Sequence, residues 1–360
     1  MSKTLGFGIL GAGLVSPFHA KSVQASKGGK LIGIADVDAA RLGKLTSEFG
    51  CKGFKSLEEM LADPEIDAVC VCTPNHLHYE AVLKIAAAGK HCLTEKPPAM
   101  SLRETDEMIV ACKKARGGAG VKFGCTVQCR VRKAMQEMKK AIETGRFGKL
   151  LQADAYMKWF REPGYYHMDA WRSSRQSGAG VTVQHAFHYI DVLQFLMGPA
   201  KQVQARMSNL AHKDVKLEDT LLAFVDFQNG AQGVVQASTA FWPGTDVRIE
   251  VNGTHGTAIM TGEKMTTWKF KDERPEDEEI RQIGNASQGT AATGPAAFGF
   301  ADHAVVIQDL IDAVNGNREV YIPVSSVRPT LEMVLAMYHS AAKNAVVQLP
   351  VQDDPAIWKM

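Results

Sequence analysis

The sequence predicts an α/β protein with a parallel, doubly wound N-terminal domain and a C-terminal α/β domain built on a large, mainly antiparallel sheet. Its 360 residues exceed what one hydrophobic core usually spans. The first third alternates apolar runs with helical patterns, which is typical of a parallel sheet with right-handed crossovers. Later strand-like runs follow one another across turn signals such as Asn229-Gly230 and Asn252-Gly253, as in antiparallel sheets. We expect the domains to span residues 1–125 and 126–360.

In the first domain, strands and helices follow each other in strict alternation. The predicted strands are residues 5–10, 31–35, 68–72, 91–94 and 121–125. The predicted helices are residues 18–25, 39–49, 77–88 and 102–114.

The second domain is predicted to contain four helices, two long loops and six strands, of which the last five follow one another. The helices are expected at residues 132–144, 182–197, 304–314 and 328–343. The strands are expected at residues 150–158, 202–207, 220–227, 233–238, 247–252 and 257–261. Residues 160–176 form a polar, aromatic-rich loop, and residues 271–299 are expected to be a long mobile loop of unknown role.

The composition is that of an ordinary soluble cytoplasmic protein. The formal net charge is +2 with scattered basic residues, so we expect neither a nucleic-acid nor a membrane partner. No apolar run approaches the ~18 residues of a membrane span, and the N-terminus is interpreted as a first strand rather than a signal peptide. The seven cysteines show no C-x-x-C pairing, so reduced thiols are expected and a metal site is not.

A glycine-rich turn follows the first strand and opens a helix. Gly11, Gly13, Leu14 and Val15 match a G-x-G-x-x-G fingerprint in which Ser16 takes the third glycine's place. The first glycine permits the tight turn, and the second lets a pyrophosphate approach backbone N–H groups at the helix N-terminus. A small serine is tolerable at the third position. The pattern indicates a Rossmann dinucleotide site, although a plain glycine turn would look the same.

Asp36 ends the second predicted strand, about 20 residues after the turn, where a carboxylate accepts hydrogen bonds from an adenosine ribose. It would repel a 2′-phosphate, so NAD is expected and NADP is less favoured. Arg41 lies nearby and leaves the NAD-versus-NADP preference open. Asp36 could also be a simple turn or N-cap residue.

Two further motifs stand at the carboxyl ends of the third and fourth predicted strands. The first is Cys72-Thr73-Pro74-Asn75-His76-Leu77-His78, and the second is Thr94-Glu95-Lys96-Pro97. In an open parallel sheet, ligands bind just beyond the strand ends. Both motifs therefore indicate the cofactor site.

Taken together, these features strongly resemble the Gfo/Idh/MocA oxidoreductases, which include glucose–fructose oxidoreductase and myo-inositol dehydrogenase. The resemblance covers essentially the whole chain. It includes the glycine turn, the T-P-N-x-x-H and E-K-P segments, residues 145–150, Trp171-Arg172 and His188-x-x-Asp191. It implies an NAD-dependent sugar dehydrogenase or reductase that forms a homodimer or homotetramer through the exposed face of the second sheet.

The resemblance also implies residue roles. Lys96 would touch both the nicotinamide ribose and a substrate hydroxyl, and His188 would be the catalytic acid/base. The remaining cofactor contacts would come from Glu95, from Thr73, Pro74 and Asn75 with His78 behind them, and from Trp171 and Arg172.

The residues of the 182–197 helix give an independent indication of a site. Gln184, His185, His188 and Asp191 fall on roughly one stripe. Buried polar groups are unfavourable unless they are paired or face a cavity, so the stripe indicates either a cleft or hydrogen-bonded core residues. Many sugar-oxidising members of the family carry Asp where this chain has Gln184. An amide cannot share a proton as a carboxylate can, which puts an inositol-dehydrogenase-like relay in doubt.

The expected reaction is hydride transfer from a secondary alcohol carbon, with His188 taking the hydroxyl proton and Lys96 stabilising the developing oxygen charge. We expect an unphosphorylated sugar, because no compact basic cluster marks a phosphate, although Arg130 and Lys158 leave a sugar acid or a nucleotide sugar open. The substrate pocket is expected to include Arg130, Tyr156 and Asp169.

Two other function classes fit the same scaffold. One is a glycoside-cleaving enzyme that oxidises its substrate transiently and regenerates NAD in each cycle. The other is a non-catalytic NAD(P)-binding sensor, against which the presence of both Lys96 and His188 argues.

Overall fold

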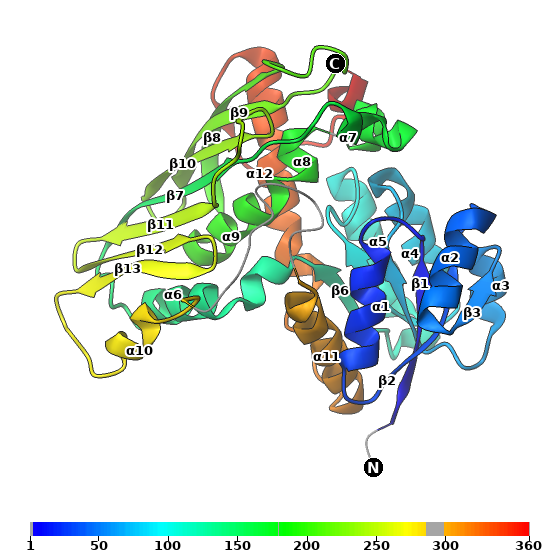
Figure 1. The fold of residues 1–360 in the computed structure, drawn as a ribbon. Coiled ribbons are helices and arrows are strands. Elements are labelled where there is room, and N and C mark those ends of the chain that lie inside the picture. Colours follow the sequence, from blue (N-terminus) through cyan, green and yellow to red (C-terminus); the bar gives the residue numbers. More distant parts are fainter. Residues whose placement is uncertain (1–2, 179, 286–298, 360) are drawn as a thin grey trace. The chain divides into compact units, whose positions relative to one another are not determined.

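The chain folds into two compact units (Figure 1). This computed structural model describes residues 3–178, 180–285 and 299–359. Unit 1 comprises Met1–Gln128 and Gly299–Arg328, and unit 2 comprises Cys129–Phe298 and Pro329–Met360. Residues 299–328, which we expected in the second domain, make their contacts within unit 1.

Unit 1 is built on a six-stranded parallel sheet with the strand order β3-β2-β1-β4-β5-β6. The predicted doubly wound fold is therefore confirmed. Its strands are β1 Leu5–Leu10, β2 Gly29–Ala35, β3 Lys52–Phe54, β4 Ala68–Val71, β5 His91–Glu95 and β6 Phe123–Thr126. Its helices are α1 Ser16–Ala25, α2 Ala39–Phe49, α3 Leu57–Ala62, α4 His78–Ala87, α5 Leu102–Lys114 and α11 Ala301–Asn315.

Two elements of unit 1, β3 and α3, were missed from the sequence. Strand β3 has three residues, of which only Phe54 is buried, so it carries no periodic signal. Helix α3 has a recognisable start, because the Ser56 side chain accepts a hydrogen bond from Glu59 N and the Glu59 carboxylate accepts one from Lys55 N. This S-x-x-E pattern is typical of helix N-termini and could have revealed α3.

The returning C-terminal segment completes unit 1. Helix α11 packs along α1 (Figure 1). Ser22 donates a hydrogen bond to Phe300 O. Beyond α11, Pro323 forms an antiparallel bridge with Gly124 of β6. Residues far apart in the sequence therefore share one core.

Unit 2 is built on an eight-stranded sheet, sheet B, with the order β13-β12-β11-β7-β10-β9-β8-β14. Only the β7–β10 pair is parallel among its described pairings, which confirms the mainly antiparallel prediction. The strands are β7 Leu150–Lys158, β8 Ala200–Ser208, β9 Thr220–Phe227, β10 Gln232–Ser238, β11 Arg248–Gly253, β12 Gly256–Thr261, β13 Lys264–Phe270 and β14 Val347–Gln348. The helices are α6 Lys133–Glu143, α7 Gly164–His167, α8 Val181–Gln184, α9 Phe187–Met197 and α10 Asp277–Arg281, and α12 Val324–Lys343 begins in unit 1 and continues into unit 2.

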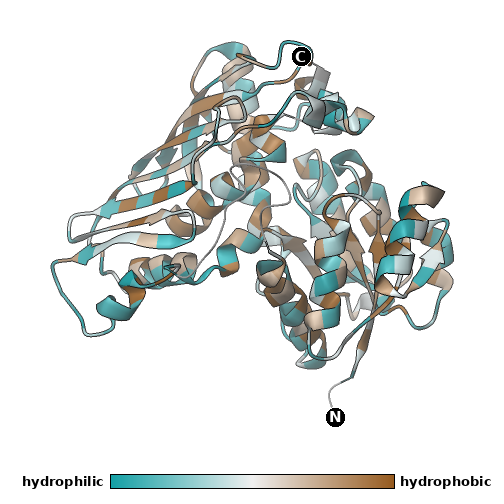
Figure 2. Ribbon diagram, viewed as in Figure 1, coloured by the Kyte–Doolittle hydropathy of each residue, from teal (hydrophilic) through white to brown (hydrophobic). Residues whose placement is uncertain are grey.

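The two faces of this sheet differ in their environment. Burial alternates along β9, and Figure 2 shows apolar and polar residues mixed along the strands. Helix α9 packs on β7 on one side. On the other side, Leu222 and Phe224 of β9 are 50% and 67% exposed.

The structure changes three expectations for unit 2. The helix predicted over 182–197 is divided into α8 and α9. The loop 160–176 contains α7 and two short 3₁₀ helices. The segment expected as a mobile loop over 271–299 includes α10, which is anchored by a buried ion pair between Asp277 and Arg146. Residues 286–298 of that segment lie outside the described residues.

Candidate active-site residues of the two units

The glycine turn of unit 1 has the geometry that its motif requires. Gly11 adopts φ 104°, and a Cβ there would lie 2.6 Å from Cys72 O. A Cβ at Gly13 would meet open space, so this position leaves room for a ligand to approach the backbone. Leu14 and Val15 complete the turn, and Val15 is the N-cap of α1.

Ser16 has a role beyond being small. Its Oγ donates a 2.7 Å hydrogen bond to Gly11 O, which closes the turn on itself. The hydroxyl is fully buried, so the bond satisfies a polar group that would otherwise be costly. The serine that replaces the third glycine of the fingerprint therefore stabilises the turn.

Asp36 lies directly against the glycine turn. Its Oδ2 accepts a 2.6 Å hydrogen bond from Ala12 N, and its Oδ1 accepts one of 2.7 Å from Asp38 N. The N-cap of α2 is Asp38, not Asp36. Arg41 pairs with Asp38 at 3.4 Å. Asp36 thus joins the end of β2 to the turn after β1, where a ribose-binding carboxylate is expected.

His78 connects the two other motifs of unit 1. Its Nδ1 lies 2.8 Å from Pro97 O and its Nε2 lies 3.0 Å from Thr73 O. The pKa of His78 is lowered, because the effect of burial exceeds the opposing effect of the hydrogen bonds to the two carbonyl groups. Pro74 precedes a short 3₁₀ helix that begins at Asn75. The fully buried imidazole therefore holds the T-P-N and E-K-P loops together.

Glu95 belongs to a buried cluster that was not predicted. Its Oε1 lies 2.7 Å from His19 Nε2 of α1 and 4.0 Å from His303 Nε2 of α11. These three ligand-type atoms lie within 4.8 Å of one another, so the groups could hold a metal ion. The 2.7 Å contact is that of a direct hydrogen bond, and Lys96 N donates a weaker one of 3.3 Å to Glu95 Oε2.

The charges of this cluster favour a histidine–carboxylate ion pair. Burial raises the pKa of Glu95, but the hydrogen bond from His19 and the charges of His19, His303 and Lys96 outweigh it and lower the pKa to about 2. Burial opposes the imidazolium of His19, but Cys72, Cys70 and Glu95 raise its pKa well above the usual value. A negative charge is therefore held next to Lys96. A lone histidine within a helix gave no sequence signal for this role.

In unit 2, the predicted stripe of polar residues lies at the junction of α8 and α9. Gln184 is the last residue of α8, and His185 leaves the helical conformation with φ −121°. Ala186 N then donates to Val181 O, five residues back. Gln184 and His185 are buried, while His188 lies in the first turn of α9 and is partly exposed.

An aromatic group brings the Trp171-Arg172 segment to His185. Arg172 Nη1 donates a 3.0 Å hydrogen bond to Tyr165 OH, and its guanidinium lies over the Trp171 ring. The Tyr165 ring lies 5.4 Å from the His185 ring. Asp169 accepts a hydrogen bond from Arg172 Nε. The structure thus brings Asp169, Trp171, Arg172 and His185 together within unit 2.

Asp191 is held in a structural ion pair. Arg130 Nε and Nη2 lie 2.7 and 2.6 Å from its two carboxylate oxygens, and Thr330 Oγ1 donates to Oδ1 at 2.8 Å. All three side chains are buried. This arrangement fits a bracing role for Asp191. The guanidinium of Arg130, which we expected to bind the substrate, is used in this ion pair instead.

Tyr156 lies on a different face of sheet B from α9. Its ring contacts Lys158 and Arg248, and its OH donates to Asp154. The neighbours of Tyr156 in β7, Ala155 and Met157, point to the opposite face of the strand and are buried. The structure therefore does not bring Tyr156 together with His188.

Comparisons with known proteins agree with this architecture. The family model for the GFO_IDH_MocA oxidoreductase family, NAD-binding Rossmann fold, matches residues 5–123, and the GFO/IDH/MocA C-terminal domain model matches residues 135–259. No helix among the described residues has the length and apolar character needed to cross a membrane.

Similar sequences and structures include named enzymes. The 1,5-anhydro-D-fructose reductase of Ensifer adhaerens is 33% identical over 70% of this chain and 74% of its own length. The myo-inositol 2-dehydrogenase of Thermotoga maritima is 30% identical over 74% of this chain and 78% of its own. The WlbA dehydrogenase of Bordetella pertussis, solved with NADH and UDP-GlcNAcA, superposes with a TM-score of 0.88 at 29% identity and covers 97% of this chain and 99% of its own. The chain therefore belongs to the Gfo/Idh/MocA family of NAD-binding oxidoreductases.

Proposed function

We propose that this protein transfers a hydride between NAD and a secondary alcohol or ketone carbon of a sugar, sugar derivative or polyol. The observation that carries the proposal is the joined set of strand-end loops in unit 1. Asp36 is bonded to the glycine turn, and His78 ties the T-P-N loop to the E-K-P loop that bears Lys96. Relatives named as an anhydrofructose reductase and an inositol dehydrogenase support the substrate class.

The residues of unit 1 fit a dinucleotide. Open space at Gly13 and backbone N–H groups at the start of α1 suit a pyrophosphate. Asp36 would accept hydrogen bonds from the adenosine ribose and favours NAD over NADP. Thr73, Pro74, Asn75, Glu95 and Lys96 would contact the rest of the cofactor, with His78 holding their loops. Trp171 and Arg172 would supply contacts from unit 2.

NAD, when bound, accepts or supplies the hydride. We assign to His188 the transfer of the hydroxyl proton, because an imidazole titrates near neutral pH. We assign to Lys96 the stabilisation of negative charge on the reacting oxygen. The ionised Glu95 next to it would keep the ammonium group charged and oriented.

For the substrate, Gln184, His185 and Asp169 offer hydrogen-bonding groups, beside the Tyr165 ring that contacts His185. Arg130 and Tyr156 remain weaker candidates because both have other partners. An amide at position 184 favours recognition of hydroxyl groups over a carboxylate relay.

We further propose a cytoplasmic homodimer or homotetramer. Leu222 and Phe224 expose apolar surface on the outer face of sheet B, which supports association through that face. All seven cysteines are free, which fits a reducing compartment. Analytical ultracentrifugation of a Phe224→Glu variant tests the association.

The decisive experiment follows reduced-cofactor absorbance with NAD or NADP and a panel of unphosphorylated sugars, anhydrosugars, sugar acids and polyols. Lys96→Met should lower kcat by about 10³-fold or more, as expected for removal of an oxygen-stabilising charge. Binding of NAD measured by calorimetry should remain. Lys113→Met, an exposed lysine of α5, is the matched control and should leave kcat unchanged.

Other outcomes assign other functions. Substrate conversion without net NADH would identify an enzyme that oxidises its substrate transiently and regenerates its cofactor. Tight NAD binding without conversion of any compound would identify a sensor. Undiminished turnover by Lys96→Met would overturn the assignment of that residue.

A further inference from the structure

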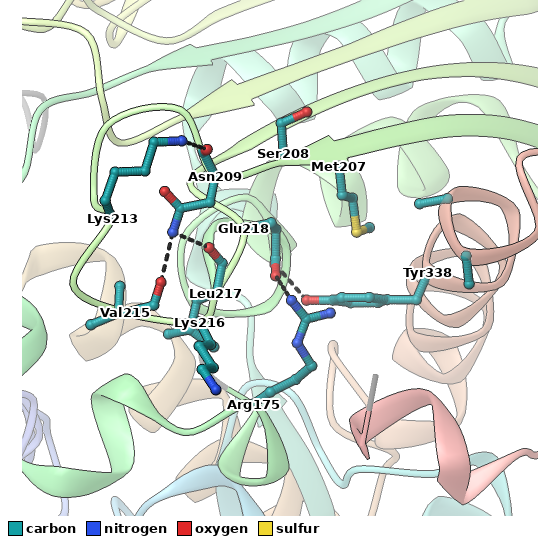
Figure 3. Close-up of a pocket in the computed structure, with 12 residues that line it drawn as sticks. Arg175, Met207, Ser208, Asn209, Lys213, Val215, Lys216, Leu217, Glu218 and Tyr338 are labelled. Atoms are coloured by element: carbon teal, nitrogen blue, oxygen red, sulfur yellow. Dashed lines mark hydrogen bonds and ion pairs between the residues drawn. The ribbon is translucent and has the colours of Figure 1, made fainter.

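Unit 2 contains a pocket that none of the assigned site residues lines. Its volume is about 580 Å³, within the range typical of small-molecule sites. It is formed by the end of β8, the loop 209–217, the C-terminal part of α12 and Arg175 (Figure 3).

The loop that forms one wall is held in a fixed shape. Asn209 Nδ2 donates to the carbonyl oxygens of His212, Val215 and Leu217 at 2.7–2.8 Å. The Asp219 carboxylate accepts hydrogen bonds from three successive backbone N–H groups, those of residues 210–212. The pocket is therefore preformed, which lowers the entropy lost on binding.

Positive charge exceeds negative charge around this pocket. Its charged lining residues are Arg175, Lys213, Lys216 and Glu218. Glu218 is buried at the edge of the pocket, and its Oε1 already accepts hydrogen bonds from Tyr338 OH at 2.6 Å and Thr182 N at 3.3 Å. The lining thus carries one carboxylate and three cationic side chains, two of them on the loop 209–217, where Lys213 Nζ donates to Asn209 O.

The pairing of Arg175 with Glu218 is incomplete. Arg175 Nη2 lies 3.6 Å from Glu218 Oε2, which is longer than a hydrogen bond, as the dashed line in Figure 3 marks. Arg175 Nε is buried and makes no hydrogen bond, and the same holds for Glu218 Oε2. A guanidinium with unused donors next to a pocket suits the oxygens of an anionic group.

We propose that this pocket is a second binding site, specific for a small organic anion that carries a carboxylate or a phosphate group. The anionic group would lie against Arg175, Lys213 and Lys216. The body of the ligand would pack on the apolar walls formed by Met207 and Val215. The site does not depend on the proposed hydride transfer.

The test is calorimetric titration of the full-length Lys96→Met chain saturated with NAD. This variant should not convert any probe. The titration therefore measures binding to the pocket whether or not the proposed hydride transfer is correct. The probes are inorganic phosphate, D-gluconate, D-glucose 6-phosphate and, as the neutral probe, D-glucose. Each is titrated into the parent chain, into a form that also carries Lys213→Met and Lys216→Met, and into a control that carries Lys201→Met instead. Lys201 is an exposed lysine of β8 that does not line the pocket.

We expect saturable binding of an anionic probe that depends on the two pocket lysines, whereas any binding of glucose should be the same in the parent and in the lysine variant. The Lys213/Lys216 double change should raise the Kd about tenfold, and added salt should weaken binding. Lys201→Met should leave the Kd unchanged. Tighter binding of glucose 6-phosphate than of gluconate would identify a phosphate ligand, and the reverse order a carboxylate.

Two results would overturn the proposal. One is the absence of saturable binding of every anionic probe up to about 10 mM, the weak end of specific affinities. The other is a Kd that changes neither in the lysine variant nor in Arg175→Met. The lysine variant keeps the test valid if Arg175→Met unfolds, because both lysines are exposed.

Discussion

Each unit of this protein buries one carboxylate next to its candidate catalytic residue, but the two carboxylates have different partners. In unit 1, Glu95 precedes Lys96 and is hydrogen-bonded to His19. In unit 2, Asp191 lies on α9, one helical turn after His188, and is paired with Arg130 through two hydrogen bonds. The first partner is an imidazole, whose charge depends on its surroundings, whereas the second is a guanidinium, which stays charged at every working pH.

This difference separates scaffold from chemistry. The arginine pair is a permanent brace, and Thr330 of α12 extends it to a third helix. In the pair of Glu95 and His19, the protonation of the histidine depends on its surroundings. This pair adjoins the E-K-P loop, which is assigned to the cofactor. Two predictions test this contrast, and a third tests Asp36, the carboxylate assigned to the cofactor.

The largest effect is expected for the brace. Arg130→Met leaves the buried charge of Asp191 uncompensated, so the free energy of unfolding should fall by about 3–5 kcal/mol. All five tryptophans lie in unit 2, so urea unfolding followed by tryptophan fluorescence reports on this unit alone. Adding Asp191→Leu to Arg130→Met should recover much of the loss. A loss below about 1 kcal/mol would mean that the pair does not brace unit 2.

The second effect concerns the pH dependence of unit 1. The pKa of Glu95 is lowered from 4.5 to about 2, so its contribution is present above pH 4.5 and is lost as the pH falls through about 2. That difference corresponds to about 3 kcal/mol. The raised pKa of His19 adds stability that is present below 6.5 and is lost only as the pH rises through its folded value.

His19→Leu removes the ion pair with Glu95, and with it both of these pH-dependent contributions. We expect a loss of about 3 kcal/mol at pH 7 and little loss near pH 2, where the parent chain has already lost most of the contribution of Glu95. Urea unfolding followed by far-UV circular dichroism measures it, since tryptophan does not report on unit 1. His303→Leu is the control with a smaller expected effect, because that ring lies farther from Glu95. Parallel pH curves for His19→Leu and the parent would contradict the ion pair.

The smallest effect is expected at Asp36. Asp36→Asn keeps an acceptor for Ala12 N but removes the charge, so the affinity for NAD should fall about tenfold and discrimination against NADP should narrow. Calorimetric Kd values for both cofactors measure the change. Ser56→Ala, which removes the side-chain cap of α3, should leave the ratio of the two Kd values unchanged. An unchanged ratio in Asp36→Asn would mean that another group selects the cofactor.

The sequence was most informative about functional residues that directly follow the end of a strand. The glycine turn, Asp36 and the two motif loops are local patterns, and parallel strands bring their carboxyl ends to one edge. The partners of the two carboxylates are not local: His303 lies far from Glu95 in the chain, and Arg130 lies 61 residues from Asp191. No periodic pattern encodes such contacts.

The break between α8 and α9 was also not predictable. No proline or glycine stands at residues 184–187, and the apolar spacing continues across the break. The division depends on tertiary contacts instead, including the packing of Trp159 and Tyr165 against His185. The stripe of polar residues was predicted, but its detailed geometry was not.

The late return of residues 299–328 to unit 1 has a consequence for biosynthesis. When the ribosome has made residues 1–128, the sheet of unit 1 is complete in sequence, but the groove beside α1 still lacks α11. An autonomously folding nucleotide domain therefore requires a fusion of residues 3–128 to 299–328, not a simple truncation. During translation, the surface of α1 that α11 will cover stays uncovered until residues 301–315 have emerged, and unit 2 is completed later still, by residues 329–360.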